Sequence, residues 1–267
     1  MKAKIFASLS VLITGAILLY AVTDFPDFGD PGSPPNAGVP GGAPSASRYY
    51  LENTYRDTKV PNVVTAVLAD YRGYDTMFET VVILTAGIAI FAILRVLRRD
   101  DAPAAPDPDP ARTDHTIDGD HHRIIVGTTC RIAAPLIQIF ALYVVAHGHY
   151  SPGGGFQGGV MLGASFILLA LSGSLRETLT RFSESDYMRM AFIGIVIYAG
   201  LGLLPMWVGR NFLDYGALSG LFMTKGEEMA RSHSMLGVEI GVAVTVMSIM
   251  FAMFANLSTR GRLRGGL

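Results

Sequence analysis

Four ionisable side chains in this 267-residue sequence lie in or beside long apolar stretches, and packing alone does not explain them. They are Glu79, Glu239, His147 and His149. An ionisable group at membrane depth is costly unless it is paired or hydrated. Imidazole is the side chain whose charge changes most readily near neutral pH. These four residues could therefore relay protons or coordinate a cation.

Glu79 lies in a polar segment, residues 62–80, in which Asp70, Arg72 and Asp75 precede it. Asp75 and Glu79 are four residues apart, so their carboxylates share one face if a helix extends back that far. Two interpretations stay open for Asp75. It belongs to an ion path with Glu79, or it caps the start of the helix. For Glu79 the ion path is the favoured interpretation.

Glu239 is flanked by Gly237 and Gly241, whose GxxxG spacing lets a neighbouring helix approach closely. A carboxylate at such a contact is predicted to be buried, with a hydrogen-bonding or proton-exchanging role. Pairing with a nearby histidine or with another subunit is the alternative. The charged residues that precede this run are expected to be mostly solvated: Asp214, Lys225, Glu227, Glu228, Arg231 and His233.

His147 and His149 open a glycine-rich hairpin. The simpler interpretation is a sharp turn followed by tight helix packing, and the alternative is that the two histidines line a proton or cation route. A metal site lacks a third ligand nearby, and a phosphate loop lacks its lysine. We therefore predict no metal, no cofactor and no catalytic residue. The hairpin glycines are Gly153, Gly154, Gly155, Gly158 and Gly159.

The elements that carry these residues are predicted to be membrane helices. The composition is 50% hydrophobic and only 16% charged, which is unusual for a soluble domain. Backbone groups in a bilayer need internal partners, and the runs lack the alternation of barrel strands. We predict an all-α integral membrane protein with about six transmembrane helices, at residues 5–22, 78–97, 132–146, 156–174, 190–208 and 235–257.

The first run could also be read as a signal peptide, but its length favours an uncleaved anchor. Basic residues gather on one side of an alternating six-helix arrangement, which predicts that both termini are cytoplasmic. Several aromatic residues near helix ends are interpreted as interfacial anchors. These are Tyr71, Tyr74, Tyr187, Tyr198, Trp207 and Tyr215.

Two Pro-rich stretches divide the chain. The predicted modules are a two-helix module at 1–99, with an external loop at 25–60, and a four-helix module at 124–267. A cytoplasmic linker at 100–123 joins them. The net charge of −1 gives no basic field for a nucleic acid, so we predict no nucleic-acid partner. A single cysteine cannot form an internal disulfide.

The stretch from His147 to Gly159, followed by an apolar helix, resembles the signature of MrpB (MnhB) subunits of multisubunit Na⁺/H⁺ antiporters. Residues 236–242 are similar to the final helix of that family. Residues 60–97 resemble the end of the large MrpA subunit, which is a small separate subunit in membrane-bound hydrogenases. The resemblance implies that two neighbouring antiporter pieces are fused here.

The resemblance further implies a membrane subunit of a monovalent cation (Na⁺)/proton antiporter-type complex in the cytoplasmic membrane of a prokaryote. MrpA-, MrpC- and MrpD-like subunits, lipids, H⁺ and Na⁺ would be its partners. The first alternative is the equivalent subunit of a redox-driven complex with a hydrogenase-like peripheral arm. The second is a purely structural scaffold. This functional inference is by analogy with the family.

Overall fold

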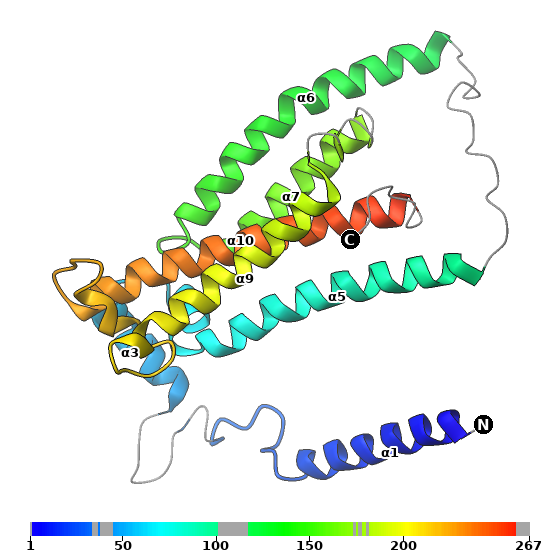
Figure 1. The fold of residues 1–267 in the computed structure, drawn as a ribbon. Coiled ribbons are helices and arrows are strands. Elements are labelled where there is room, and N and C mark those ends of the chain that lie inside the picture. Colours follow the sequence, from blue (N-terminus) through cyan, green and yellow to red (C-terminus); the bar gives the residue numbers. More distant parts are fainter. Residues whose placement is uncertain are drawn as a thin grey trace. The chain divides into compact units, whose positions relative to one another are not determined.

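The computed structural model describes residues 2–33, 37, 45–100, 117–172, 175, 178, 179 and 182–259. This part of the chain is helical and contains no strand. The long helices are α1 (Lys2–Val22), α5 (Gly73–Asp100), α6 (Ile117–Ala146), α7 (Gly155–Ser172), α9 (Glu184–Trp207) and α10 (Glu227–Ser258) (Figure 1). The short elements are α3 (Ala46–Thr58), α4 (Val63–Ala66), the π-helix η1 (Val67–Tyr71) and the 3₁₀-helix η3 (Tyr215–Ser219).

Helices α5, α6, α7, α9 and α10 are long and apolar enough to cross a membrane, and α1 contains a shorter apolar stretch, Ser8–Val22. The predicted all-α membrane protein with about six helices is thereby confirmed. The helix ends differ from the apolar runs. Helix α10 begins at Glu227, ahead of 235, and α6 begins at Ile117, inside the predicted linker. Backbone hydrogen bonding can continue beyond the apolar stretch that enters the bilayer, so hydropathy alone shortens such helices.

The chain forms two compact units, residues 1–53 and 54–267. In the first unit, apolar side chains of α1 are exposed along the helix, as Phe6 and Leu19 illustrate. Such a surface suits a helix that faces lipid or another membrane protein. The second unit contains all the long helices other than α1, together with the residues predicted to carry chemistry.

Helix α10 is the centre of the second unit and contacts α9, α7 and α5, while α6 packs on α7 (Figure 1). Glycines make these contacts close. A Cβ at Gly159 would lie 2.8 Å from the Ala243 carbonyl oxygen, and a Cβ at Gly241 would lie 2.7 Å from that of Gly194. Small residues thus bring α7 and α9 against the backbone of α10.

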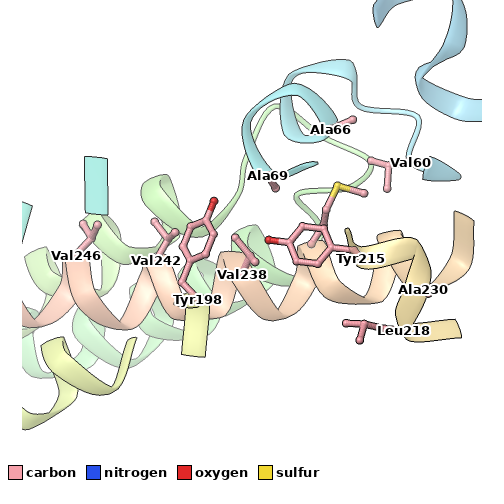
Figure 2. Close-up of a cluster of buried hydrophobic side chains, with 11 residues drawn as sticks. Val60, Ala66, Ala69, Tyr198, Tyr215, Leu218, Ala230, Val238, Val242 and Val246 are labelled. Carbon is pink, nitrogen blue, oxygen red and sulfur yellow. The ribbon is translucent and has the colours of Figure 1, made fainter. Parts of the chain in front are cut away.

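One end of this unit holds an apolar cluster that includes Tyr198 and Tyr215, which are 0% and 1% exposed (Figure 2). Tyr187, in a second cluster, is also fully buried. The interpretation of these three tyrosines as interfacial anchors is therefore wrong. Their rings fill junctions between helices, whereas Tyr74 and Trp207 are exposed.

Candidate functional site

Asn62 joins the segment before α5 to the glycine-rich hairpin. Its side-chain oxygen accepts a 3.0 Å hydrogen bond from the Val64 N–H, which caps α4. Its side-chain amide donates to the carbonyl oxygens of Gly148 (2.8 Å) and Ser151 (2.6 Å), and its backbone N–H donates to the His149 carbonyl. The two segments, more than eighty residues apart in sequence, are therefore held together at one residue.

The hairpin glycines leave the space that the Glu239 carboxyl group occupies. A Cβ at Gly148 would lie 2.7 Å from Oε2 of Glu239, and one at Gly154 would lie 2.9 Å from Oε1. At Gly155 an added Cβ would lie 2.0 Å from the Glu239 backbone oxygen. Gly154 also has a φ of +153°, which favours glycine. These glycines form a cradle for one carboxyl group as well as a turn.

The remaining predicted glycines serve packing. A Cβ at Gly153 would lie 2.8 Å from the Val144 side chain, and one at Gly158 would lie 2.3 Å from that of Val145, both on α6. At Gly237 an added Cβ would contact Leu201 of α9 at 2.6 Å.

Glu239 is enclosed, and 7% of the residue is exposed. Its Oε2 atom has no hydrogen-bond partner within the described part of the chain. The Thr65 hydroxyl interacts electrostatically with this carboxyl group, but the hydrogen bond that it donates, 2.8 Å long, goes to the Gly148 carbonyl oxygen. A buried carboxyl oxygen without a partner is costly. This atom is therefore available to bind a water molecule, a cation or a proton.

Glu239 and Glu79 line the same cavity, which has a volume of about 340 Å³. The cavity is large enough to hold several water molecules. Segment 62–83 forms one side, and the hairpin with α10 forms the other. The polar residues on its walls are Asn62, Thr65, Thr76, Glu79, Thr80, Gln157 and Glu239. The structure thus brings the two glutamates and five further polar residues to one site.

Glu79 differs from Glu239 in its surroundings. It is exposed on α5 and forms no hydrogen bond or ion pair with another described residue. Its helix neighbours Thr76 and Thr80 donate hydrogen bonds back to the carbonyl oxygens of Leu68 and Thr76. Glu79 therefore lies where the cavity meets the outside of the unit.

Asp70 forms an ion pair with Arg231 of α10, and the Arg231 Nε donates to Oδ2 of Asp70 at 2.9 Å. The side chain of Asp70 is only 4% exposed. Burial raises the pKa of Asp70, and Arg231 opposes that rise. Arg231 is therefore an exception among the charged residues that are expected to be mostly solvated, because a buried carboxylate lies opposite it.

Arg72 and Asp75 pair with each other, with Nε 2.7 Å from Oδ2, and both side chains are largely exposed. Neither residue lines the cavity. Asp75 is in the first turn of α5, where a carboxylate interacts favourably with the helix dipole.

His147 and His149 also lie away from the cavity walls. The His147 ring stacks on Tyr143, with centroids 4.8 Å apart. The Nε2 atom of His149 is buried and lacks a hydrogen-bond partner among the described residues. Burial, together with the nearby His233, lowers the pKa of His149.

The polar cavity residues other than the glutamates were not predicted as site residues. Thr76 and Thr80 lie four residues apart and flank Glu79 in an apolar run, and Asn62 precedes a helix as an N-cap residue does. These signals were present in the sequence, but nothing in it linked them to α10. Among the described residues there is no group of three or more His, Cys, Asp or Glu residues that could hold a metal ion.

The fold and the cavity define a multi-pass helical membrane protein whose polar site is shared by two sequence segments. Comparison with known families identifies both segments. Residues 125–252 match the family described as "Domain related to MnhB subunit of Na+/H+ antiporter", and residues 42–107 match the MbhE family, the E subunit of MBH. The chain therefore contains a domain similar to the MnhB family, preceded by a segment similar to MbhE.

Individual relatives agree with this assignment. The probable A/B subunit of a K⁺/H⁺ antiporter of Rhizobium meliloti is 29% identical over 62% of this chain, which spans 17% of that protein. The putative antiporter subunit mnhB2 of Staphylococcus haemolyticus is 27% identical over 51% of this chain and 94% of its own length. The chain thus corresponds to a small part of the first relative, whereas about half of it matches nearly all of the second.

Two solved structures have a similar fold. One is the Mrp complex from Dietzia sp. DQ12-45-1b, with a TM-score of 0.60, 24% identity, and coverage of 100% of this chain and 27% of that one. The other is the membrane-bound sulfane sulfur reductase, an archaeal respiratory membrane complex, with a TM-score of 0.53 and 22% identity. In that case 92% of this chain and 97% of the other are covered.

Proposed function

We propose that this chain is a subunit of a monovalent cation/proton antiporter complex and that its cavity forms part of the ion path. The observation that carries the proposal is the placement of Glu79 and Glu239 on one cavity built by both family segments. Carboxylates at membrane depth bind cations or exchange protons when water reaches them. The antiporter relatives support Na⁺ or K⁺ as the exchanged ion.

The chain supplies ion-binding groups and has no active site of its own in this proposal. Its partners are other membrane subunits of the complex, of the MrpA, MrpC and MrpD types. The two carboxyl groups would have different roles in ion transfer. Enclosed Glu239 would hold a proton or a partly dehydrated cation, and exposed Glu79 would pass it to a group on the neighbouring subunit.

We also propose that the protein lies in the cytoplasmic membrane with both termini inside. The basic residues of the sequence support this orientation. The hydrogen bonds between Asn62 and the hairpin, and the ion pair between Asp70 and Arg231, support placing these segments at one end of the bundle. In this orientation, that end and the cavity beside it are near the external surface.

The proposal is tested with Glu239→Gln and Glu79→Gln in the full complex, measured as cation-driven proton movement in everted membrane vesicles. Glutamine keeps the shape but cannot exchange a proton. We expect both variants to lose at least about tenfold in rate, which corresponds to about 1.4 kcal/mol. The matched control is Glu227→Gln, the same change at an exposed position of α10. Unchanged transport by both variants in an intact complex would leave only a scaffold role.

A second candidate is the same subunit in a redox-driven complex. The coverage of 97% of a chain of the archaeal respiratory complex, together with the MbhE match, favours it. Purification of the complex with its neighbours separates the two candidates. Iron–sulfur or hydrogenase-like subunits in the purified complex would identify the redox-driven form, and antiporter subunits alone would identify the other.

A further inference from the structure

Two buried tyrosine hydroxyl groups lie behind the cavity wall. In Figure 2 the hydroxyl group of Tyr215 of η3 points toward the side on which Tyr198 of α9 lies. Tyr198 donates a 2.6 Å hydrogen bond to the Gly73 carbonyl oxygen. The Tyr215 hydroxyl is buried and finds no hydrogen-bond partner in the described part of the chain. An apolar ring would fill the Tyr215 position without leaving a polar atom unmatched.

The two hydroxyl groups converge on Gly73, at the start of α5. A Cβ at this glycine would lie 3.7 Å from the Tyr198 hydroxyl oxygen and 3.9 Å from that of Tyr215. Both oxygens therefore border the same small region. One water molecule placed there could hydrogen-bond to both, because each hydroxyl can donate one bond and accept others.

Tyr198 is not among the residues that line the cavity, but its hydroxyl interacts electrostatically with two that do, Thr76 and Glu79. The hydroxyl of Tyr198 is thus next to the groups that we propose exchange ions.

Tyr215 faces a charged network that leads away from the cavity. Its hydroxyl interacts electrostatically with Tyr198 and Asp70, without a hydrogen bond to either, and Asp70 pairs with Arg231. The Arg231 guanidinium lies over the Tyr71 ring, 5.6 Å from its centroid, and the Tyr71 hydroxyl donates to Asp57 at 2.9 Å. Asp57 and Asp214 are the other carboxylates near Asp70. The side chain of Arg231 is 28% exposed, so this network reaches the surface.

We propose that Tyr198 and Tyr215 form a proton relay that connects the cavity with the Asp70–Arg231 ion pair. The inference rests on the proposed function, because a relay needs a cavity that exchanges protons. It assigns a route to two residues that the family matches do not single out.

The relay is a set of proton transfers without any change in oxidation state. A proton from the cavity binds the Tyr198 oxygen, and the original hydroxyl proton turns from the Gly73 carbonyl and leaves to the bridging water. That water passes one of its protons to Tyr215, whose own proton moves through a further water molecule to the Asp70 carboxylate, because the two groups are not in direct hydrogen-bonding contact. Each tyrosine ends neutral, and one proton has crossed.

The electrostatics suit these steps. Burial, with smaller contributions from Tyr198 and Asp70, raises the pKa of Tyr215, so its hydroxyl stays protonated between transfers. Burial likewise raises the pKa of Asp70, which makes this carboxylate a better proton acceptor, while Arg231 limits the effect.

The test replaces each tyrosine by phenylalanine in the full complex. Tyr215→Phe and Tyr198→Phe remove one oxygen atom and keep the ring. We expect each to slow proton movement in vesicles by about tenfold or more, since a positioned proton-transfer group contributes at least that much. The control is Tyr74→Phe, an exposed tyrosine next to Gly73 whose contacts with Phe78 and Phe212 use only the ring.

The thermal stability of each phenylalanine variant is measured in parallel. Proton movement by Glu239→Gln is measured in the same assay. Tyr215→Phe should leave stability unchanged or higher, because its hydroxyl has no partner to lose among the described residues. If both phenylalanine variants move protons at the wild-type rate while Glu239→Gln does not, the relay is wrong and the cavity proposal stands. If Glu239→Gln and Glu79→Gln also transport normally, the proposed function itself fails. A slow rate that accompanies loss of assembled complex assigns Tyr198 to structure and overturns the relay.

Discussion

Helices α10 and α5 are both apolar and both carry a glutamate on the same cavity, but their surroundings differ. In the most apolar stretch of α10, 72% of the residues are buried within this chain, against 17% in α5. Glu239 is accordingly enclosed and Glu79 is exposed. The chain itself therefore determines the environment of the Glu239 carboxyl group, whereas lipid, water or a neighbouring subunit determines that of Glu79.

The largest effect is expected when the ion pair between Asp70, which precedes α5, and Arg231 of α10 is broken. Arg231→Met leaves Asp70 buried without its counter-charge, and loss of one partner from such a pair costs about 3 kcal/mol. The free energy of unfolding, or the melting temperature of the purified protein, measures the loss. Further replacement of Asp70 by Leu should restore most of it. Arg48→Met, which breaks an exposed pair with Glu52, should lower the free energy of unfolding much less, because solvent screens that pair. Equal losses for the two arginines would show that the Asp70 pair is solvated.

The substitution Gly155→Ala tests the enclosure of Glu239 directly. The new methyl group would overlap the Glu239 backbone oxygen, which has little room to move, and such overpacking costs about 2 kcal/mol. Lower stability and less chain in the purified complex are expected. Gly200→Ala, on α9 with open space around the new Cβ, should be neutral or slightly stabilising. A tolerated Gly155→Ala would contradict the close approach of α7 to α10.

The contrast in exposure predicts a contrast in chemical labelling. An apolar carbodiimide applied to the separately expressed chain in detergent should modify Glu79 about fivefold faster than Glu239, which corresponds to about 1 kcal/mol. Peptide mass mapping reads out both sites. In the assembled complex, a neighbouring subunit on α5 should protect Glu79. Similar labelling of the two residues in the separate chain would remove the distinction.

The smallest effect concerns the hairpin that covers Glu239. Because the pKa of His149 is lowered in the folded protein, the folded state binds fewer protons at this residue than the unfolded state. Its contribution to stability is complete above the unfolded value of 6.5 and decreases as the pH falls below it. The melting temperature should therefore fall on acidification, and less so in His149→Gln. An unchanged slope in that variant would assign the pH dependence to other groups.

The sequence predicted the helices well, because length and apolarity are local properties. Residues 1–99 and 124–267 were separated as modules on composition, whereas contacts group residues 54–267 as one unit. The glutamates were singled out because a charge in an apolar run is itself a local signal. That Glu79 and Glu239 share a cavity depends on the packing of α5 against α10, which no periodicity encodes.

Other parts of the site could not be read from the sequence for the same reason. Arg231 looked solvated among neighbouring charges, because its partner Asp70 is 161 residues away. Tyr198 and Tyr215 looked like interfacial anchors, because an aromatic residue near a helix end has the same local pattern whether it meets lipid or a protein core. The hairpin glycines pointed to a turn, and only the fold shows that Gly154 and Gly155 border Glu239.

The hydrogen bonds of Asn62 have a consequence for gene architecture. They hold the MbhE segment on the MnhB-type segment without any help from the peptide link between them. A chain break within residues 101–116 should therefore give two polypeptides that reassemble when they are co-expressed. The mnhB2 relative, which matches this chain over 94% of its own length as a protein by itself, is what such a split would leave on one side. Gene fusion and gene fission would then be nearly neutral exchanges during evolution, with Asn62 preserving the contact in either arrangement.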